Sequence, residues 1–104
     1  MVKLALLVTL EARPGKEKEV EQFLQSGLGI VDREPNTINW YALKIGNGTY
    51  GIFDTFEDEN GRKAHLSGEI AKALTQRGGE LFAKAPKIET VDLIAVKQEM
   101  AHQH

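Results

Sequence analysis

The sequence predicts one α+β domain whose strands and helices follow one another in the order β-α-β-β-α-β. Three observations indicate this fold class. Strand-like and helix-like segments alternate along the 104 residues, an Asn-Gly pair near the middle is typical of a tight hairpin, and 41% apolar residues is an ordinary globular proportion. We expect a single domain over residues 1–98 and a flexible tail over residues 99–104, because this length suits one domain.

The first strand and the first helix are expected on either side of a Pro-Gly break. Residues 2–12 are rich in Leu and Val and predict a strand, which ends at Pro14-Gly15. Residues 16–32 predict a helix, because apolar side chains recur there at helical spacing, at Val20, Phe23, Leu24, Leu28 and Val31. Gly27 and Gly29 each cost a helix about 1 kcal/mol relative to alanine, so we expect a kink or an early end near them.

The middle of the chain predicts a hairpin followed by a helical region. Residues 37–45 and 49–57 are strand-like and flank Gly46-Asn47-Gly48, whose Asn-Gly pair suits the positive φ angles of a tight turn. A helical region is expected to begin at Asp58, which can accept hydrogen bonds from free backbone amides at a helix N-terminus. It is expected to pause at Ser67-Gly68 and to resume at Glu69.

The end of the domain predicts one more strand. Gly78-Gly79 is expected to interrupt the second helical region, and residues 88–96 predict the last strand. The resulting order is that of the ferredoxin-like fold, in which an antiparallel sheet carries its helices on one face.

The second face of this sheet is unusually apolar. A strand with one face in water alternates apolar and polar residues, but Ala5 and Leu7 accompany the apolar set Leu4, Leu6, Val8 and Leu10 on the first strand. Helices cover only one face, and a large apolar patch on the other usually marks a partner surface. We therefore predict a homodimer in which two sheets pack face to face. The alternative is that the strands of a small domain are simply apolar throughout.

Composition excludes several function classes. The chain has no cysteine, so it has no disulfide, thiolate nucleophile, iron–sulfur cluster or cysteine zinc site. Thirteen Lys and Arg against 15 Asp and Glu give a net charge of −2, which provides no broad basic surface for nucleic acid or anionic lipid. The longest apolar run, residues 4–8, is far shorter than a membrane span of about 20 residues. We expect a cytoplasmic protein with neither nucleic acid nor membrane as a partner.

One histidine and one carboxylate are the candidate catalytic groups. His65 is the only histidine within the expected domain, and it could act as a general base near neutral pH. Its alternative role is structural, with the ring hydrogen-bonded between helix and sheet. Asp54 could orient His65 or accept a proton itself, or it could pair with Arg62 or Lys63. Arg62 could bind an anionic group of a substrate or be an exposed helix cation.

Aromatic residues of the hairpin are the candidate substrate-binding groups. Trp40 and Tyr41 face opposite sides of the sheet, so at most one of them lines a given pocket, and either offers a flat surface for a planar ligand. Both could instead be core residues. Asn39 shares the face of Tyr41 and could donate to a bound oxygen or be a polar edge residue. The paired histidines of the tail, His102 and His104, are not expected to bind a metal.

Residues 38–44, 52–56 and 61–68 together resemble the antibiotic biosynthesis monooxygenase family of dimeric α/β barrels. In that family an acidic-x-aromatic pair ends the third strand, and Asp54 and Phe56 match it. A helix with an Ala-His or similar pair follows, and His65 lies nine residues after Phe56. The resemblance covers roughly residues 2–97, and it implies a pocket between the sheet and the helices. We assign Phe56 and Phe23, with the hairpin aromatics, to substrate binding there.

The resemblance implies a cofactor-independent monooxygenase that acts on a planar aromatic or quinol-type small molecule. Haem is disfavoured, because residues 70–78 contain no histidine and residues 4–10 offer no amide side chain where haem-degrading relatives need them. The usual tryptophan of the family is replaced by Phe56, which keeps an aromatic wall but lacks the N–H donor. A non-catalytic dimeric binding protein and an isomerase using the same pocket are the alternatives.

Overall fold

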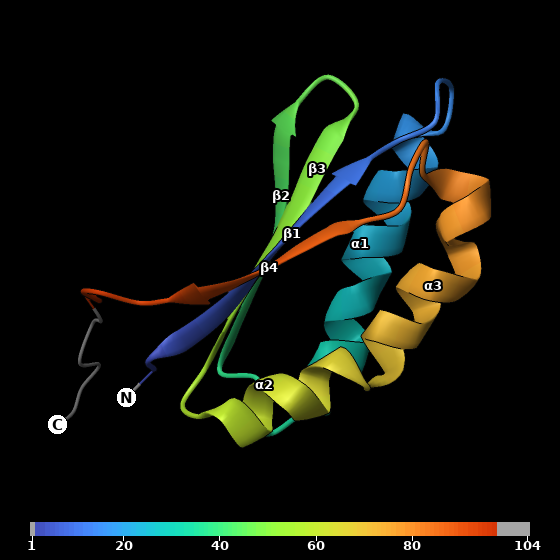
Figure 1. Ribbon diagram of the computed structural model, residues 1–104. Helices are drawn as coiled ribbons and strands as arrows, with labels where there is room; N and C mark the ends of the chain where they lie inside the picture. Colours follow the sequence, from blue (N-terminus) through green and yellow to red (C-terminus); the bar gives the residue numbers. More distant parts are fainter. Residues whose placement is uncertain (1, 98–104) are drawn as a thin grey trace, which may run out of the picture.

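The computed structural model describes residues 2–97, so the tail expected over residues 99–104 lies outside the described residues. The elements follow the predicted order, with the second helical region divided into two helices at Ser67-Gly68 (Figure 1). They are β1 (Leu4–Glu11), α1 (Glu17–Val31), β2 (Asn39–Gly46), β3 (Thr49–Phe56), α2 (Glu59–Leu66), α3 (Glu69–Leu81) and β4 (Lys87–Asp92).

The four strands form one antiparallel sheet in the order β2-β3-β1-β4. The three helices lie on one side of this sheet, with α1 and α3 along it and α2 across one end (Figure 1). The predicted ferredoxin-like fold is therefore confirmed.

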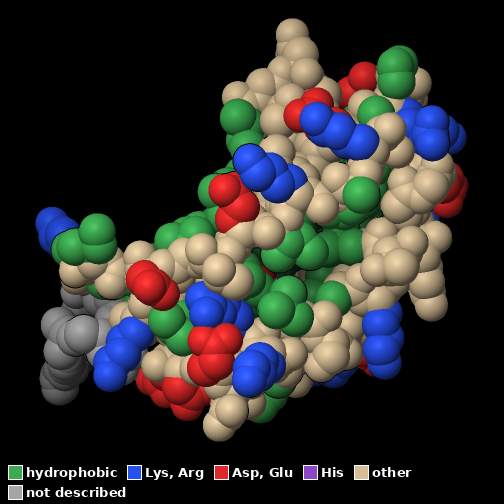
Figure 2. Space-filling view, in the orientation of Figure 1, with side chains coloured by type: hydrophobic (Ala, Val, Ile, Leu, Met, Phe, Trp, Pro, Cys, Tyr) green, Lys and Arg blue, Asp and Glu red, His purple; other side chains and the backbone are tan. Residues whose placement is uncertain are grey.

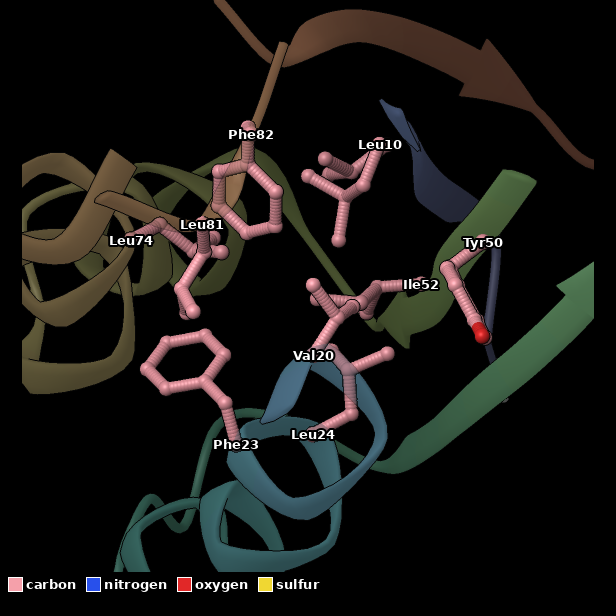
Figure 3. Packing of buried hydrophobic residues seen from close by; sticks show 10 residues of the cluster. Leu10, Val20, Phe23, Leu24, Tyr50, Ile52, Leu74, Leu81 and Phe82 are labelled. Atoms are coloured by element: carbon pink, nitrogen blue, oxygen red, sulfur yellow. The ribbon is translucent and has the colours of Figure 1, made fainter. Parts of the chain in front are cut away.

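The core lies between the sheet and the two long helices. The strand register sets Leu6, Val8 and Leu10 of β1 opposite Asp54, Ile52 and Tyr50 of β3, and all six side chains are buried. Side chains of α1 and α3 pack on these strand residues and complete the hydrophobic core (Figure 3). The core cluster consists of Val8, Leu10, Val20, Phe23, Leu24, Tyr50, Ile52, Leu74, Leu81 and Phe82. The Tyr50 hydroxyl donates to Glu21 Oε2 at 2.7 Å, which ties β3 to α1. This hydrogen bond, with burial, raises the pKa of Tyr50 to about 12.

The pause predicted at Ser67-Gly68 is confirmed, but the early end predicted near Gly27 and Gly29 and the interruption predicted at Gly78-Gly79 are wrong. Helix α1 continues through Gly27 and Gly29 to Val31, and α3 continues through Gly78-Gly79 to Leu81. Gly27 is buried where α1 meets its neighbours: a Cβ there would lie 2.9 Å from Ile70 Cδ1 and 3.3 Å from Trp40 Cη2. Close packing between the helix and its neighbours therefore explains glycine at this position. Helix propensity, which depends only on the local sequence, does not include this effect.

The hairpin is confirmed, but its turn differs from the prediction. Only Gly48 has a positive φ, +79°, whereas Asn47 does not, and the register shifts between Lys44 and Gly46. Several strand ends also differ from the prediction. β1 begins at Leu4 instead of residue 2, β2 begins at Asn39 instead of residue 37, and β4 ends at Asp92 instead of residue 96. In the antiparallel register Asp92 pairs with Leu4, the first residue of β1, and beyond it Leu93 N donates to Lys3 O at 2.9 Å.

The sheet face without helices carries the predicted apolar set. Leu7, Phe53 and Val91 are half-buried there, and the ring of Tyr41 stacks on that of Phe53 with centroids 6.4 Å apart. Tyr41 remains 52% exposed. We call this the uncovered face. Within residues 2–97, no helix has the length and apolar character that crossing a membrane requires.

Candidate functional site

The position of His65 follows from the start of helix α2. The Asp58 carboxylate accepts from the backbone N–H of Gly61 at 2.9 Å and caps the helix. One side of the following helix is buried, and Gly61, Arg62 and His65 lie on it. The side chain of His65 is only 8% exposed and points to the end of β3.

Two carboxylates hold the imidazole ring of His65. Its Nε2 lies 2.7 Å from Asp54 Oδ2, and its Nδ1 lies 2.7 Å from Glu34 Oε1. Thr37 Oγ1 donates to the same Glu34 oxygen at 3.0 Å and lies 3.3 Å from Nδ1. Because an ionised carboxylate only accepts, this arrangement suits a ring that carries a proton on both nitrogens. We refer to Asp54, His65 and Glu34 as the carboxylate–histidine trio.

The electrostatics of the trio agree with its geometry. Burial by itself lowers the pKa of His65, but the hydrogen bonds and charges of Asp54 and then Glu34 outweigh it, so the pKa lies above its usual 6.5. The ring of Phe56 packs against the imidazole with centroids 5.4 Å apart. Phe56 is itself completely buried. Geometry and electrostatics therefore both favour the charged form of the His65 ring over a free neutral base.

Arg62 has a structural position. Its Nη2 lies 2.7 Å from Glu59 Oε1, and its Nη1 donates to the carbonyl oxygens of Ala5 at 3.3 Å and Val91 at 3.4 Å. The prediction of an exposed helix cation is wrong, because Arg62 is buried and ties α2 to β1 and β4. Asp54 pairs with His65 instead of Arg62 or Lys63.

Trp40 lies on the same side of the sheet as the trio. It is directly opposite Asp54 in the register of β2 and β3, and its ring edge packs near Gly27 of α1. Three buried polar atoms in this region have no hydrogen-bond partner within the described part of the chain. They are Trp40 Nε1 and both carboxylate oxygens of Asp54, of which Oδ2 has its ion-pair contact with His65 Nε2.

Two of the remaining predicted substrate residues share a surface hollow with a member of the trio, because Asn39 and Tyr41 line a hollow that Glu34 also borders. Tyr41 and Asn39 lie on the uncovered face, where Asn39 Oδ1 accepts from Thr55 Oγ1 at 2.8 Å. Phe23 lies in the main core, edge-on to Phe82 with centroids 6.4 Å apart. The pleat of β2 sets Trp40 and Tyr41 on opposite faces, as predicted, and both border this hollow, whereas Phe23 does not line it.

The trio reaches the surface at Glu34, which is 20% exposed. Two hollows share Glu34 and Thr37 as lining residues. One, of about 300 Å³, lies between the end of α1 and β2 and is bordered by Leu28, Ile38 and Trp40. The other, of about 370 Å³, lies at the junction of α2 and α3 beside Gly68. We call them the Trp40 hollow and the Gly68 hollow.

Glu34 is the functional candidate that the sequence did not reveal. It lies in the break between α1 and β2, where no periodicity marks which side chain turns inward. Its spacing of three residues from Thr37, to which it is hydrogen-bonded, is a weak signal because such pairs are common in turns.

A third hollow lies between the sheet and a helix, where the family resemblance places a pocket. It has a volume of about 410 Å³ between β4 and α3, and Leu66, Leu74 and Ile88 contribute to its largely apolar lining. Figure 2 shows hydrophobic side chains gathered in this part of the surface. No member of the trio lines it. Across residues 2–97, no group of three or more His, Asp or Glu side chains is arranged to hold a metal ion.

Comparison with known proteins gives one near relative and several fold neighbours. No protein-family model and no curated protein matches the sequence. The NE2512 protein of unknown function from Nitrosomonas europaea is 48% identical over 95% of this chain and 96% of that chain, with a TM-score of 0.92.

Two structures named "putative antibiotic biosynthesis monooxygenase" are more distant. The one from Caulobacter crescentus is 23% identical over 90% of this chain and 92% of that chain, with a TM-score of 0.77. The one from Nitrosomonas europaea is 11% identical over 88% and 90%, also with a TM-score of 0.77. At these identities the likeness establishes the fold. The chain belongs to the same family as the NE2512 protein and has the ferredoxin-like fold of the antibiotic biosynthesis monooxygenases.

Proposed function

We propose that this protein is a small monooxygenase that takes a planar, electron-rich aromatic or quinol-type substrate and supplies no cofactor of its own. The observation that carries the proposal is the carboxylate–histidine trio, which is buried at Asp54 and His65 and opens to the surface at Glu34. The Trp40 hollow offers an aromatic wall beside Glu34 for a planar ring. The names of the fold neighbours from Caulobacter and Nitrosomonas add support for the reaction class.

The chemistry requires the protein to remove one proton and to exclude water. With His65 protonated and both carboxylates ionised, the trio has a net charge of −1 and can accept a proton from an acidic C–H or O–H group. The substrate anion then supplies the electrons that reduce O₂. For a ring CH₂ group the balance is CH₂ + O₂ → C=O + H₂O, so one oxygen atom enters the product and the other leaves as water. Proton transfer of this kind typically contributes about 10²–10⁴ to a rate.

Oxygen consumption tests this proposal. Purified protein is mixed with a panel of quinols and hydroxyanthrones in an oxygen electrode, beside a His65→Gln variant and a Gln22→Glu variant. Gln22 lies on the exposed side of α1 and serves as the matched control. We expect uptake by the wild type and the control and strong loss in His65→Gln. Uptake no faster than in the protein-free solution for every substrate would contradict the proposal.

The hollow between β4 and α3 favours a second candidate function, the binding of a small hydrophobic molecule without turnover. Ile88 and Leu66 are exposed large apolar side chains at this hollow, and no ionisable member of the trio is near enough to line it. This candidate predicts that a hydrophobic ligand raises the melting temperature equally in the wild type and in His65→Gln. An isomerase that uses the trio would instead convert substrate under argon as fast as in air.

We further propose that the protein is a homodimer that pairs through the uncovered face. Leu7, Phe53 and Tyr41 give this face an apolar centre without any covering helix. Sedimentation velocity is expected to give twice the monomer mass for the wild type and for Gln22→Glu. Phe53→Glu would bury a charge at the centre of the contact and should give monomers. A wild type that sediments as a monomer at high concentration would refute the dimer.

A further inference from the structure

We infer that Glu34, through its Oε2 atom, is the base that meets the substrate, while His65 and Asp54 position it from behind. This inference rests on the proposed removal of a substrate proton, and it assigns that step to one atom. The sequence had directed attention to His65 for the same role. The contacts of the three side chains favour Glu34 over His65 as the base.

His65 has no free nitrogen with which to take a proton. Both ring nitrogens lie 2.7 Å from carboxylate oxygens, and Phe56 packs against the ring. Asp54 is completely buried, and the oxygen that faces His65 is already engaged. A substrate therefore cannot contact His65 or the engaged oxygen of Asp54 unless the contacts within the trio are broken.

Glu34 divides its two oxygens between different tasks. Oε1 faces His65 Nδ1 at 2.7 Å and accepts from Thr37 Oγ1 at 3.0 Å, which fixes the carboxylate plane. Oε2 has no hydrogen-bond partner among residues 2–97. The side chain is the most exposed of the trio and lines both hollows. Oε2 is thus held in place, and no hydrogen bond from the described residues occupies it.

Gly68 keeps the space beside this oxygen free. A Cβ at position 68 would lie 2.9 Å from Glu34 Oε2, closer than ordinary van der Waals contact allows. Glycine at the start of α3 therefore lets Oε2 lie at the Gly68 hollow, and the Glu34 side chain also borders the Trp40 hollow in which the planar ring is proposed to bind. Arg33 and Glu69 border the same hollow but pair with each other at 3.4 Å, and both are largely exposed to solvent. They are poorly placed to replace Glu34.

The assigned step is a simple proton transfer. The C–H bond of the substrate breaks, its electron pair stays on carbon as a delocalised enolate, and the proton binds Glu34 Oε2. The trio passes from a net charge of −1 to neutral, with the His65 imidazolium still facing both partners. A carboxylate held in this way by a second group is an established kind of enzymatic base for protons next to a carbonyl.

The test measures proton abstraction without oxygen. Under argon in D₂O, NMR follows the exchange of the ring CH₂ protons of 1,8-dihydroxyanthrone in the presence of each protein. The variants are Glu34→Gln, Glu34→Ala with and without sodium formate, and Glu80→Gln as the control, an exposed position of α3 that lines neither hollow. We expect kcat for exchange to fall at least about 100-fold in Glu34→Gln with KM nearly unchanged, and to remain unchanged in Glu80→Gln.

Formate separates a chemical role from a structural one. It should restore exchange in Glu34→Ala, where it can occupy the vacated carboxylate position, but not in Glu34→Gln, where the amide fills that position. Exchange in Glu34→Gln as fast as in the wild type, or no formate rescue, would overturn the role of Glu34. So would a wild type that does not exchange these protons at all. Exchange by the wild type without oxygen uptake in air would sustain Glu34 and refute the monooxygenase.

Discussion

Replacing Gly27 by alanine tests how closely α1 approaches α3 and β2. The new Cβ would lie 2.9 Å from Ile70 Cδ1 and 3.3–3.4 Å from two ring atoms of Trp40. Ile70 is only 1% exposed, so its terminal methyl must move within a packed core. Such overpacking typically costs about 1–3 kcal/mol, whereas alanine recovers about 1 kcal/mol of helix propensity. The free energy of unfolding should therefore fall by up to about 2 kcal/mol.

Gly29→Ala is the matched control for this substitution. Gly29 lies two residues further along the same helix, and a Cβ there has nothing within 4 Å. Only the propensity gain remains, so this variant should be more stable than the wild type by up to about 1 kcal/mol. Urea denaturation followed by circular dichroism measures both variants. If Gly27→Ala proves as stable as Gly29→Ala, the helices do not approach as closely as the structure indicates, and the explanation of this glycine fails.

Three further predictions concern the trio and its surroundings. The pKa of His65 is higher in the folded protein than in the unfolded chain, so its stabilising contribution is complete below about pH 6.5 and is lost as pH rises through the folded value. Urea denaturation across pH 5.5–9 should show this slope, at most about 1.4 kcal/mol per pH unit, and His65→Gln should lack it. Trp40→Phe should change the free energy of unfolding by less than about 1 kcal/mol, because Nε1 has no hydrogen bond to lose; a loss above about 2 kcal/mol in the same assay would contradict that. Gly68→Ala should displace the Glu34 carboxylate and lower the pKa of His65, and an unchanged NMR titration of the imidazole would show that the two side chains do not meet there.

Periodicity was sufficient to predict the element order but not every boundary. Alternation along β1 and β3 placed Leu6, Val8 and Ile52 on one face, and helical spacing placed Val20 and Leu24 toward them. Both patterns depend only on the local repeat of a strand or helix. The errors at Gly27 and at the end of β4 have another origin, because each depends on a neighbour that is distant in sequence.

Part of the trio was predictable for the same reason. Asp54 lies between Ile52 and Phe56 on the buried face of β3, and a carboxylate at such a position needs a partner. His65 on the buried side of α2 supplies that partner. Glu34 approaches His65 from 31 residues away, through a segment without regular structure, and its direction is set by how the end of α1 meets α2 and α3. No pattern within the sequence contains that information.

Glu34, the carboxylate that the sequence did not reveal, changes the chemistry expected of Asp54 and His65. A histidine bonded to Asp54 alone would keep one nitrogen free, and it could act as the neutral base that the sequence suggested. A second carboxylate at 2.7 Å occupies that nitrogen and favours the charged ring. In the proposed mechanism the role of proton acceptor then passes to Oε2 of Glu34, the most exposed member of the trio. Because Glu34 contacts the buried His65 instead of pointing into solvent, the expected reactive atom is Oε2 of Glu34, in the loop before β2, and not a ring nitrogen of His65 in α2.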